Sequence, residues 1–395
     1  RKEDCYLEIG GGKTHAFELL RMKDMNEIAD GKIKVFGPEI TDLPEDSQAP
    51  IGIMVSVAGR KMQEDFEPIL ERQMHHFING AEGVLHLGQR DIIWMRISKG
   101  AKAKGFKLHH LGGILKAKLV SDYPSIVDKV QVDIYTEPEK VDELLAEARK
   151  IYAHRDERVA GMTDESVDIF YSCTLCQSFA PNHVCVISPE RLGLCGAYNW
   201  LDGKAAYEIK PTGPNQPVVK GETIDAAKGQ WKGINEFVYQ ASHHSLERFN
   251  AYSMMEDPMT SCGCFECIVA ILPLCNGVMV VNREYPGMTP SGMKFSTLAG
   301  SVGGGVQTPG FIGVGKQYLV SKKFISAEGS FKRIAWMPKA LKDSMYEQLK
   351  KRAEEIGAPD FVDKIADETV AVTEEEVMNH MVQVGHPALE MSPMF

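Results

Sequence analysis

Six of the nine cysteines in this 395-residue chain lie in two short stretches whose spacings suit metal binding. The first stretch has the pattern C-x2-C-x8-C-x9-C, formed by Cys173, Cys176, Cys185 and Cys195. Four thiolates within one loop-rich stretch are typical of the ligands of a cubane iron–sulfur cluster. The first stretch therefore predicts a cluster bound largely by one segment of the chain.

The second stretch, Cys262-Gly263-Cys264, indicates a different metal. Two thiolates and the two amide nitrogens between them can close three fused chelate rings around a metal that prefers a square plane. Nickel(II) and copper(II) have that preference, whereas zinc and iron do not. Gly263 has no Cβ, so the backbone can turn flat around the metal.

Two plainer interpretations of the cysteines are disfavoured. The chain is long enough to bury a core without disulfides, and its first residues lack the apolar segment of a secretion signal. Four-cysteine zinc sites usually contain two C-x2-C pairs, and only one pair here has that spacing. Cys5, Cys267 and Cys275 lie outside the pattern; the last two occupy an apolar run, which predicts buried free thiols.

The two stretches together resemble acetyl-CoA synthase. This nickel enzyme is joined to carbon monoxide dehydrogenase in acetogenic bacteria and is related to the β subunit of the methanogen decarbonylase/synthase complex. The resemblance rests on FYSCTLCQSFAPNHVCVISPERLGLCGAYNW and SCGCFEC, and it extends over the whole chain as the family's middle and C-terminal domains. All six cysteine positions of the family's metal site are filled. The chain lacks an initiator Met and is too short for the bacterial N-terminal domain. We therefore expect a trimmed fragment or the shorter methanogen type.

The resemblance implies a definite set of metal ligands. Cys173, Cys176, Cys185 and Cys195 would hold a [4Fe-4S] cluster, and Cys176 would also bridge to a proximal nickel. Cys262 and Cys264 would bind a distal nickel through their sulfurs and the amide nitrogens of Gly263 and Cys264, and would bridge back to the proximal metal. Copper or zinc could replace nickel at the proximal position. Phe179 would pack over the proximal metal, which makes Cys176, Cys262, Cys264 and Phe179 the candidate catalytic residues.

The resemblance also implies a reaction and partners. A methyl group from a corrinoid iron–sulfur protein, carbon monoxide from carbon monoxide dehydrogenase, and coenzyme A would be condensed into acetyl-CoA by a cytoplasmic acyltransferase. Two other functions fit the cysteines: an iron–sulfur electron-transfer protein without nickel chemistry, and a zinc-stabilised binding module. Metal analysis would separate the three.

Coenzyme A carries phosphates, so its site should offer cationic side chains and an aromatic wall. The candidates lie in the first part of the chain: Arg60, Arg90, Trp94 and Arg96. The alternative is that Arg90 and Arg96 form structural ion pairs with acids such as Asp91 and Glu82, and that Trp94 belongs to the core.

Composition excludes other function classes. The formal net charge of −10 argues against nucleic-acid binding, and no apolar stretch reaches the length of a membrane span. The glycine-rich segment 301–324 has neither phosphate-binding glycine motif. We expect its backbone to pack closely against the metal loops or to form a channel.

The remaining pattern predicts α/β to α+β architecture in two domains, a middle domain over residues 1–145 and a metal-binding domain over 146–395. Apolar runs and alternation predict strands at 51–59, 128–136, 167–172 and 277–284. Helical spacing predicts helices at 62–80, 137–155, 226–244, 337–357 and 373–385, the last one capped by Thr373. Segment 211–222 is predicted to be a surface loop.

Overall fold

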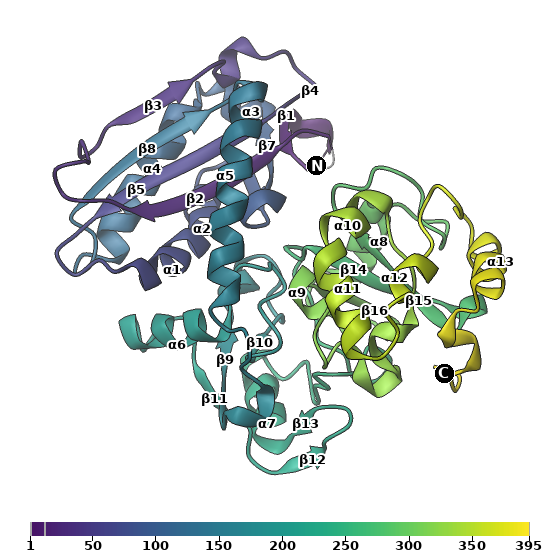
Figure 1. Cartoon of the computed structure of the whole chain (residues 1–395). Helices are drawn as coiled ribbons and strands as arrows, with labels where there is room; N and C mark the ends of the chain where they lie inside the picture. Colours follow the sequence, from purple (N-terminus) through teal and green to yellow (C-terminus); the bar gives the residue numbers. More distant parts are fainter. Residues whose placement is uncertain (1, 12, 395) are drawn as a thin grey trace. The chain divides into compact units, whose positions relative to one another are not determined.

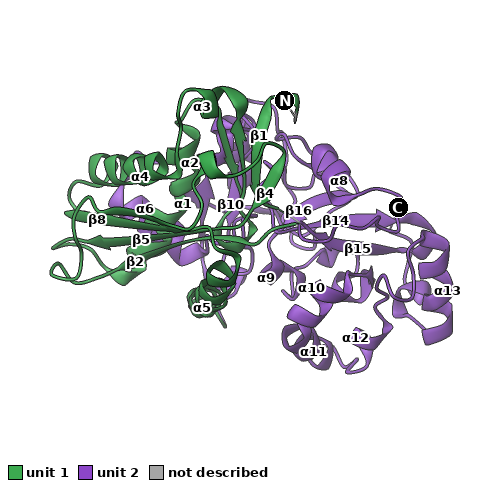
Figure 2. Cartoon of the chain, turned by 90° about the horizontal axis from the view of Figure 1, so that it is seen from above, with its two compact units in different colours: residues 1–160 green, residues 161–395 purple. Residues whose placement is uncertain are grey.

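The computed structural model describes residues 2–11 and 13–394 and divides into two compact units, Arg1–Ala160 and Gly161–Phe395 (Figures 1 and 2). Each unit contains mixed sheets flanked by helices, which confirms the predicted fold class. The units divide just after helix α5 (Pro138–Glu157), whereas the boundary predicted from the sequence lies at residue 145. The assignment of separate roles to the two domains stays a prediction.

Unit 1 is built on a four-stranded sheet of mixed direction. Its strand order is β2 (Ala16–Met22), β5 (Ile51–Ala58), β8 (Lys129–Tyr135) and β3 (Ile33–Phe36). Every second residue of β8 is fully buried, as its alternating sequence predicts. Helix α5 covers one face of the sheet and α4 (Leu108–Asp122) covers the other, as the edge-on view in Figure 2 shows.

A second sheet of unit 1 has the order β4 (Ser47–Ala49), β1 (Cys5–Gly10), β7 (Trp94–Ser98) and β6 (Val84–Leu87). The predicted helix at 62–80 is wrong as one element, because it forms two short helices, α1 (Glu67–Arg72) and α2 (Met74–Asn79), that meet at Gln73. Polar residues of these helices, Glu67, Glu71 and Arg72, are buried. Hydrogen bonds from these buried polar side chains to distant parts of the chain determine where the two helices end. The spacing of apolar residues in the sequence gives no information about such bonds.

Unit 2 contains two larger sheets and a small hairpin. The first sheet has the order β10 (Cys185–Ile187), β9 (Ile169–Cys173) and β11 (Pro217–Val219). The second has the order β16 (Phe311–Val314), β14 (Cys267–Leu272), β15 (Gly277–Asn282) and β17 (Ile334–Trp336). The hairpin pairs β12 (Thr223–Asp225) with β13 (Gln230–Trp231). Cys267 and Cys275 are completely buried in the apolar run, as predicted.

The helices of unit 2 are short. They are α6 (Trp200–Ile209), α7 (Lys232–Ala241), α8 (Phe295–Val302), α9 (Lys316–Leu319), α10 (Lys339–Ser344), α11 (Tyr346–Glu355), α12 (Phe361–Lys364) and α13 (Glu374–Val384). Thr373 caps α13 through a reciprocal interaction with Glu376, which confirms the predicted cap.

Two sequence predictions in unit 2 are only partly right. The predicted helix at 226–244 begins six residues late, because Trp231 belongs to β13 and packs edge-on against Phe170 and Tyr252, with ring centroids 5.5 and 5.7 Å away. The predicted surface loop at 211–222 contains β11, where Val218 pairs with Phe170 and is buried. Within the described residues, no helix combines the length and apolarity that a membrane span requires.

Candidate metal centre

Strand pairing positions the first cysteines. Cys173 ends β9 and stands directly opposite Cys185, the first residue of antiparallel strand β10. Cys176 follows on a single turn of 3-10 helix, Leu175–Ser178. The side chains of all three are buried. One strand pair and the turn after it therefore hold three of the four predicted cluster ligands.

A tight turn positions Cys195. Gly196 has a φ of +74°, and a Cβ on it would lie 2.2 Å from the carboxylate of Glu266, so only glycine fits. Glu266 in turn accepts a 2.6 Å hydrogen bond from the backbone N–H of Lys316, and its own N–H donates to the carbonyl of Leu194. Glu266 lies two residues after Cys264, so these contacts join the two cysteine stretches.

The decisive feature is the convergence of Cys176, Cys262 and Cys264. Their Sγ atoms all lie within 4.8 Å of one another, and all three residues are buried. The N–H of Cys264 points to the Sγ of Cys262 at 3.3 Å, and Gly263 has a φ of +129°. The two sulfurs of the C-G-C segment and the amide nitrogen of Cys264 therefore lie close together. All nine cysteines of the chain are buried and form no disulfide.

This crowding has an electrostatic consequence. Hydrogen bonding to Cys176 and Cys264, together with burial, raises the pKa of the Cys262 thiol well above its ordinary value. Three adjacent buried thiols cannot all ionise unless a cation compensates them. Soft metal ions provide that compensation and prefer thiolate ligands. The arrangement is therefore suited to a thiolate-bound metal.

Two further segments surround this centre. Phe179 lies over the C-G-C segment, because a Cβ on Gly263 would lie 3.6 Å from its Cε1, and half of the Phe179 side chain is exposed. The glycine-rich segment packs against the metal loops, as predicted. A Cβ on Gly303 would lie 3.3 Å from the carbonyl oxygen of Cys262, and one on Gly305 would lie 3.0 Å from the backbone nitrogen of His183.

Sequence reasoning missed one residue of this site, Arg283. Its Nη2 donates to the carbonyl oxygen of Gly263 at 2.6 Å, and its guanidinium lies over the ring of Phe295, 5.2 Å from the centroid. Burial lowers the pKa of Arg283 from its ordinary value, and negative charge on Cys264 and Cys262 offsets only part of that shift. The sequence gives one indication that Arg283 could lie at this site, which is its position directly after the apolar strand β15.

Two family models match the chain. The model of the C-terminal region of the ACS/CODH beta subunit matches residues 152–395, which include all six cysteines. The model of the beta subunit of the CO dehydrogenase/acetyl-CoA synthase complex matches residues 1–141. The chain belongs to this family.

Curated relatives agree with this membership. The chain is 57% identical over 395 residues to the carbon monoxide dehydrogenase/acetyl-CoA synthase subunit alpha of Moorella thermoacetica, and the match covers 100% of this chain and 54% of that protein. It is 45% identical over 391 residues to the acetyl-CoA decarbonylase/synthase complex subunit beta of Methanopyrus kandleri, covering 99% and 82% respectively. The chain thus spans about half of the length of the Moorella relative. A solved structure of the C-terminal domain of the acetyl-coenzyme A synthase alpha subunit is 56% identical, with a TM-score of 0.33, and covers 34% of this chain and 100% of that chain.

The structure places the four candidate coenzyme A residues in different surroundings. Arg90 is buried, donates to both carboxylate oxygens of Asp156 at 2.8 and 3.0 Å, and stacks on Tyr152. The guanidinium of Arg96 lies over the Trp94 ring at 4.3 Å and pairs with Glu8 at 2.9 Å.

The fourth candidate and the two acids considered as ion-pair partners lie elsewhere. Arg60 is exposed and lies 3.5 Å from Asp128. Asp91 and Glu82, the acids considered as alternative partners, instead pair with Arg149 and Lys104. The structure therefore brings Trp94 and Arg96 into direct contact, while Arg90 is held by Asp156. The coenzyme A assignment of these residues stays a prediction.

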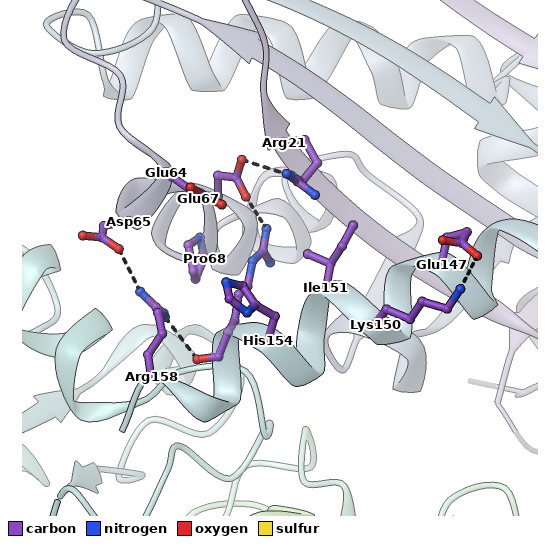
Figure 3. A pocket seen from close by; sticks show the side chains of 11 residues that line it. Arg21, Glu64, Asp65, Glu67, Pro68, Glu147, Lys150, Ile151, His154 and Arg158 are labelled. Carbon is purple, nitrogen blue, oxygen red and sulfur yellow. Dashed lines mark hydrogen bonds and ion pairs between the residues drawn. The ribbon is translucent and has the colours of Figure 1, made fainter. Parts of the chain in front are cut away.

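A cavity of about 330 Å³ lies in unit 1 between β2, α1 and α5, and none of the four candidates lines it (Figure 3). Its cations are matched by acids: Arg21 and Arg155 with Glu67, Arg158 with Asp65, and Lys150 with Glu147. Because its charges are mutually paired, this cavity offers no excess positive charge for phosphate groups.

Proposed function

We propose that this chain is the acetyl-CoA synthase module of its complex, and that its metal centre combines a [4Fe-4S] cluster with two nickel ions. One observation carries the proposal: the sulfurs of Cys176, Cys262 and Cys264 converge within 4.8 Å in a buried place. Cys176 belongs to the cluster-type stretch and the other two to the C-G-C segment, so the meeting of the stretches supports one combined centre.

The residues present fit this centre. Cys173, Cys176, Cys185 and Cys195 offer four thiolates for the iron cluster. The C-G-C segment offers two sulfurs and two amide nitrogens for a square-planar metal, and Gly263 already has the positive φ that a side chain would strain. When bound, the proximal metal supplies the organometallic chemistry that joins a methyl group, carbon monoxide and coenzyme A.

The chain's own residues contribute burial and access. Tyr198 is buried beside the Cys195 turn, and its hydroxyl donates to Asn215 Oδ1 at 3.2 Å. Trp200 donates from its Nε1 to the carbonyl of Ile169 at 2.9 Å and stacks edge-on with Tyr171. These contacts fix two aromatic side chains of the segment that follows Cys195. The half-exposed ring of Phe179 lies over the C-G-C segment and sets the size of what can approach it.

The proposed reaction has two suppliers and one acceptor. The methyl group comes from a corrinoid iron–sulfur protein, carbon monoxide comes from carbon monoxide dehydrogenase, and coenzyme A accepts the acetyl group. The name of the Moorella relative supports the roles of carbon monoxide dehydrogenase and coenzyme A, since that protein is named as a subunit of a carbon monoxide dehydrogenase/acetyl-CoA synthase. The corrinoid protein is proposed from the sequence resemblance alone.

Metal analysis and one assay test the proposal. The chain is reconstituted without oxygen with iron, sulfide and nickel, and acetyl-CoA formation from methyl-corrinoid protein, carbon monoxide and coenzyme A is measured. We expect about four irons and about two nickel ions per chain, with activity that depends on nickel. Iron without nickel would support electron transfer instead, and zinc alone without activity would support a binding module.

A further inference from the structure

We propose that Arg283 is a positioning residue that selects a square-planar metal at Cys262-Gly263-Cys264, acting through the carbonyl oxygen of Gly263. This inference rests on the proposed function, because it takes nickel(II) as the metal bound by this segment. It concerns a residue outside the cysteine pattern, and the fold alone brings it to the site.

The antiparallel pair β14 and β15 places Arg283. Cys267, at the start of β14, pairs with Asn282, at the end of β15, so residue 283 emerges beside the segment that precedes β14. From there Nη2 donates to Gly263 O at 2.6 Å, and the guanidinium stacks on Phe295. Its Nε is buried and makes no hydrogen bond within the described part of the chain. A guanidinium that is both stacked and hydrogen-bonded is held in one orientation.

Metal binding changes the charge of the C-G-C segment. Coordination by two sulfurs and by the amide nitrogens of Gly263 and Cys264 releases two thiol protons and two amide protons to solvent, and no electron is transferred. Four negatively charged donors around one nickel(II) leave a net charge of minus two. Buried charge is costly unless it is paired and hydrogen-bonded, and Arg283 places a positive charge beside this segment.

The position of the hydrogen bond makes this effect selective. The carbonyl oxygen of Gly263 and the amide nitrogen of Cys264 belong to one peptide group, and resonance shares charge between them. Negative charge created at that nitrogen therefore reaches the oxygen that Arg283 contacts, and the hydrogen bond becomes charge-assisted on both sides. A metal held by sulfur alone, such as zinc(II), creates no charge on the peptide. Arg283 should therefore favour nickel(II) over zinc(II).

The test measures the affinities of both metals in cluster-containing protein stripped of nickel. Nickel(II) and zinc(II) are titrated separately against a competing chelator, and iron content is measured in parallel. Arg283→Met should lower nickel affinity about tenfold to a hundredfold, the range expected for losing a hydrogen bond to a charged group, while zinc affinity stays within about twofold. Arg283→Lys keeps the charge without the planar fork and should give an intermediate nickel affinity.

Arg333→Met is the matched control. Arg333 is a buried arginine of unit 2 that, like Arg283, donates to backbone carbonyls, in its case those of Glu328, Asn276 and Ser392. None of these carbonyls belongs to the C-G-C segment. Loss of Arg333 should lower the melting temperature and leave both metal affinities unchanged.

Three outcomes overturn the inference. Nickel affinity that is unchanged in Arg283→Met overturns it, and so does a parallel fall in both affinities, which would indicate general loss of structure. If Arg283→Met does not fold, unchanged nickel affinity in Arg283→Lys overturns it. Wild-type protein that binds no nickel contradicts the proposed function as well, whereas nickel binding that is equal in wild type and variants contradicts this inference alone.

Discussion

One buried polar cluster in unit 1 and one in unit 2 are built in opposite ways. In unit 1, Arg155 is buried between two buried acids and pairs with Glu67 and with Glu71 at 2.9 Å each. Glu71 also accepts a hydrogen bond from the N–H of Leu20. In unit 2, three buried thiols of one chemical kind converge at Cys176, Cys262 and Cys264. The cluster in unit 1 joins opposite charges, whereas the cluster in unit 2 joins three sulfur donors of the same kind.

This difference in charge indicates that the cluster around Arg155 is a structural ion-pair network, whereas the three cysteines are a set of metal ligands. A buried ion pair compensates its own charges, so unit 1 needs no added ion there. Clustered thiols that ionise together repel one another, and the single positive charge of Arg283 beside them cannot balance three thiolates, so an added cation is needed. Substitutions in the two places should therefore have distinguishable effects, on stability in unit 1 and on metal content in unit 2.

The largest effect is expected at the cysteine shared by both parts of the centre. Cys176→Ala should lose both iron and nickel, because this sulfur is assigned to the cubane and to the proximal metal. Cys264→Ala should lose nickel and keep most of the cubane's visible absorption. Iron and nickel contents per chain provide the measurement. A Cys176→Ala protein with an intact cubane and active nickel would show that the assignment is wrong.

Gly263→Val should lose nickel alone. Its φ of +129° is strained for a β-branched residue, although a Cβ there meets only Phe179 at an ordinary contact distance. The cubane uses four other residues, so iron content should stay close to that of the wild type. Gly357→Val is the control, since Gly357 has a φ of +69° in open space far along the sequence from the cysteines. Equal nickel content in Gly263→Val and wild type would exclude the C-G-C chelate.

These ligands illustrate what sequence can reveal. Cysteine spacing is local chemistry, so all six candidate ligands could be named in advance, and the strands β8 and β15 followed from alternation and apolarity. Arg283 could not be named, because its contact with Gly263 depends on the register of β14 against β15. The break of the predicted helix at Gln73 has a similar cause, since buried Glu71 is held by Arg155, which is distant in sequence.

Unit 1 should respond through stability. Arg155→Met removes the cation shared by two buried carboxylates and should lower the free energy of unfolding by about 3–5 kcal/mol. Metal content per folded chain should not change. Lys150→Met is the matched control on the same helix, because the Lys150–Glu147 pair is exposed and should contribute less than about 1 kcal/mol. Chemical denaturation measures both, and similar losses in the two variants would contradict the structural role of the network.

A buried histidine gives unit 2 its own pH dependence. His386 accepts from the N–H of Ala388 and contacts the carbonyl of Ile334 at 3.0 Å, and burial lowers its pKa from 6.5 to about 4. Below pH 6.5 the unfolded state gains a proton that the folded state does not. The neutral, buried His386 therefore makes its full contribution to the free energy of unfolding above pH 6.5. That contribution falls by about 3 kcal/mol in total as the pH falls towards 4.

Unfolding free energies measured between pH 7 and pH 4 test this. His386→Gln has no titrating ring, so the difference in unfolding free energy between it and the wild type should shrink as the pH falls. A difference that is constant across this range would show that His386 does not titrate as its burial requires.

The smallest effect is expected at Arg96, and it tests whether a charged residue of unit 1 contacts coenzyme A. Arg96 lies over Trp94 and is partly exposed, whereas Arg90 is buried against Asp156. If this pair contacts coenzyme A, Arg96→Ala should raise the KM for coenzyme A about two- to tenfold and leave methyl transfer to the metal centre unchanged, because ground-state binding alone is lost. Arg90→Ala should instead destabilise unit 1, since it leaves Asp156 buried without this partner. Lys104→Ala, which removes an exposed pair with Glu82, should change neither property. An unchanged KM in folded Arg96→Ala protein would place the coenzyme A site elsewhere and leave the charges of unit 1 with a structural role.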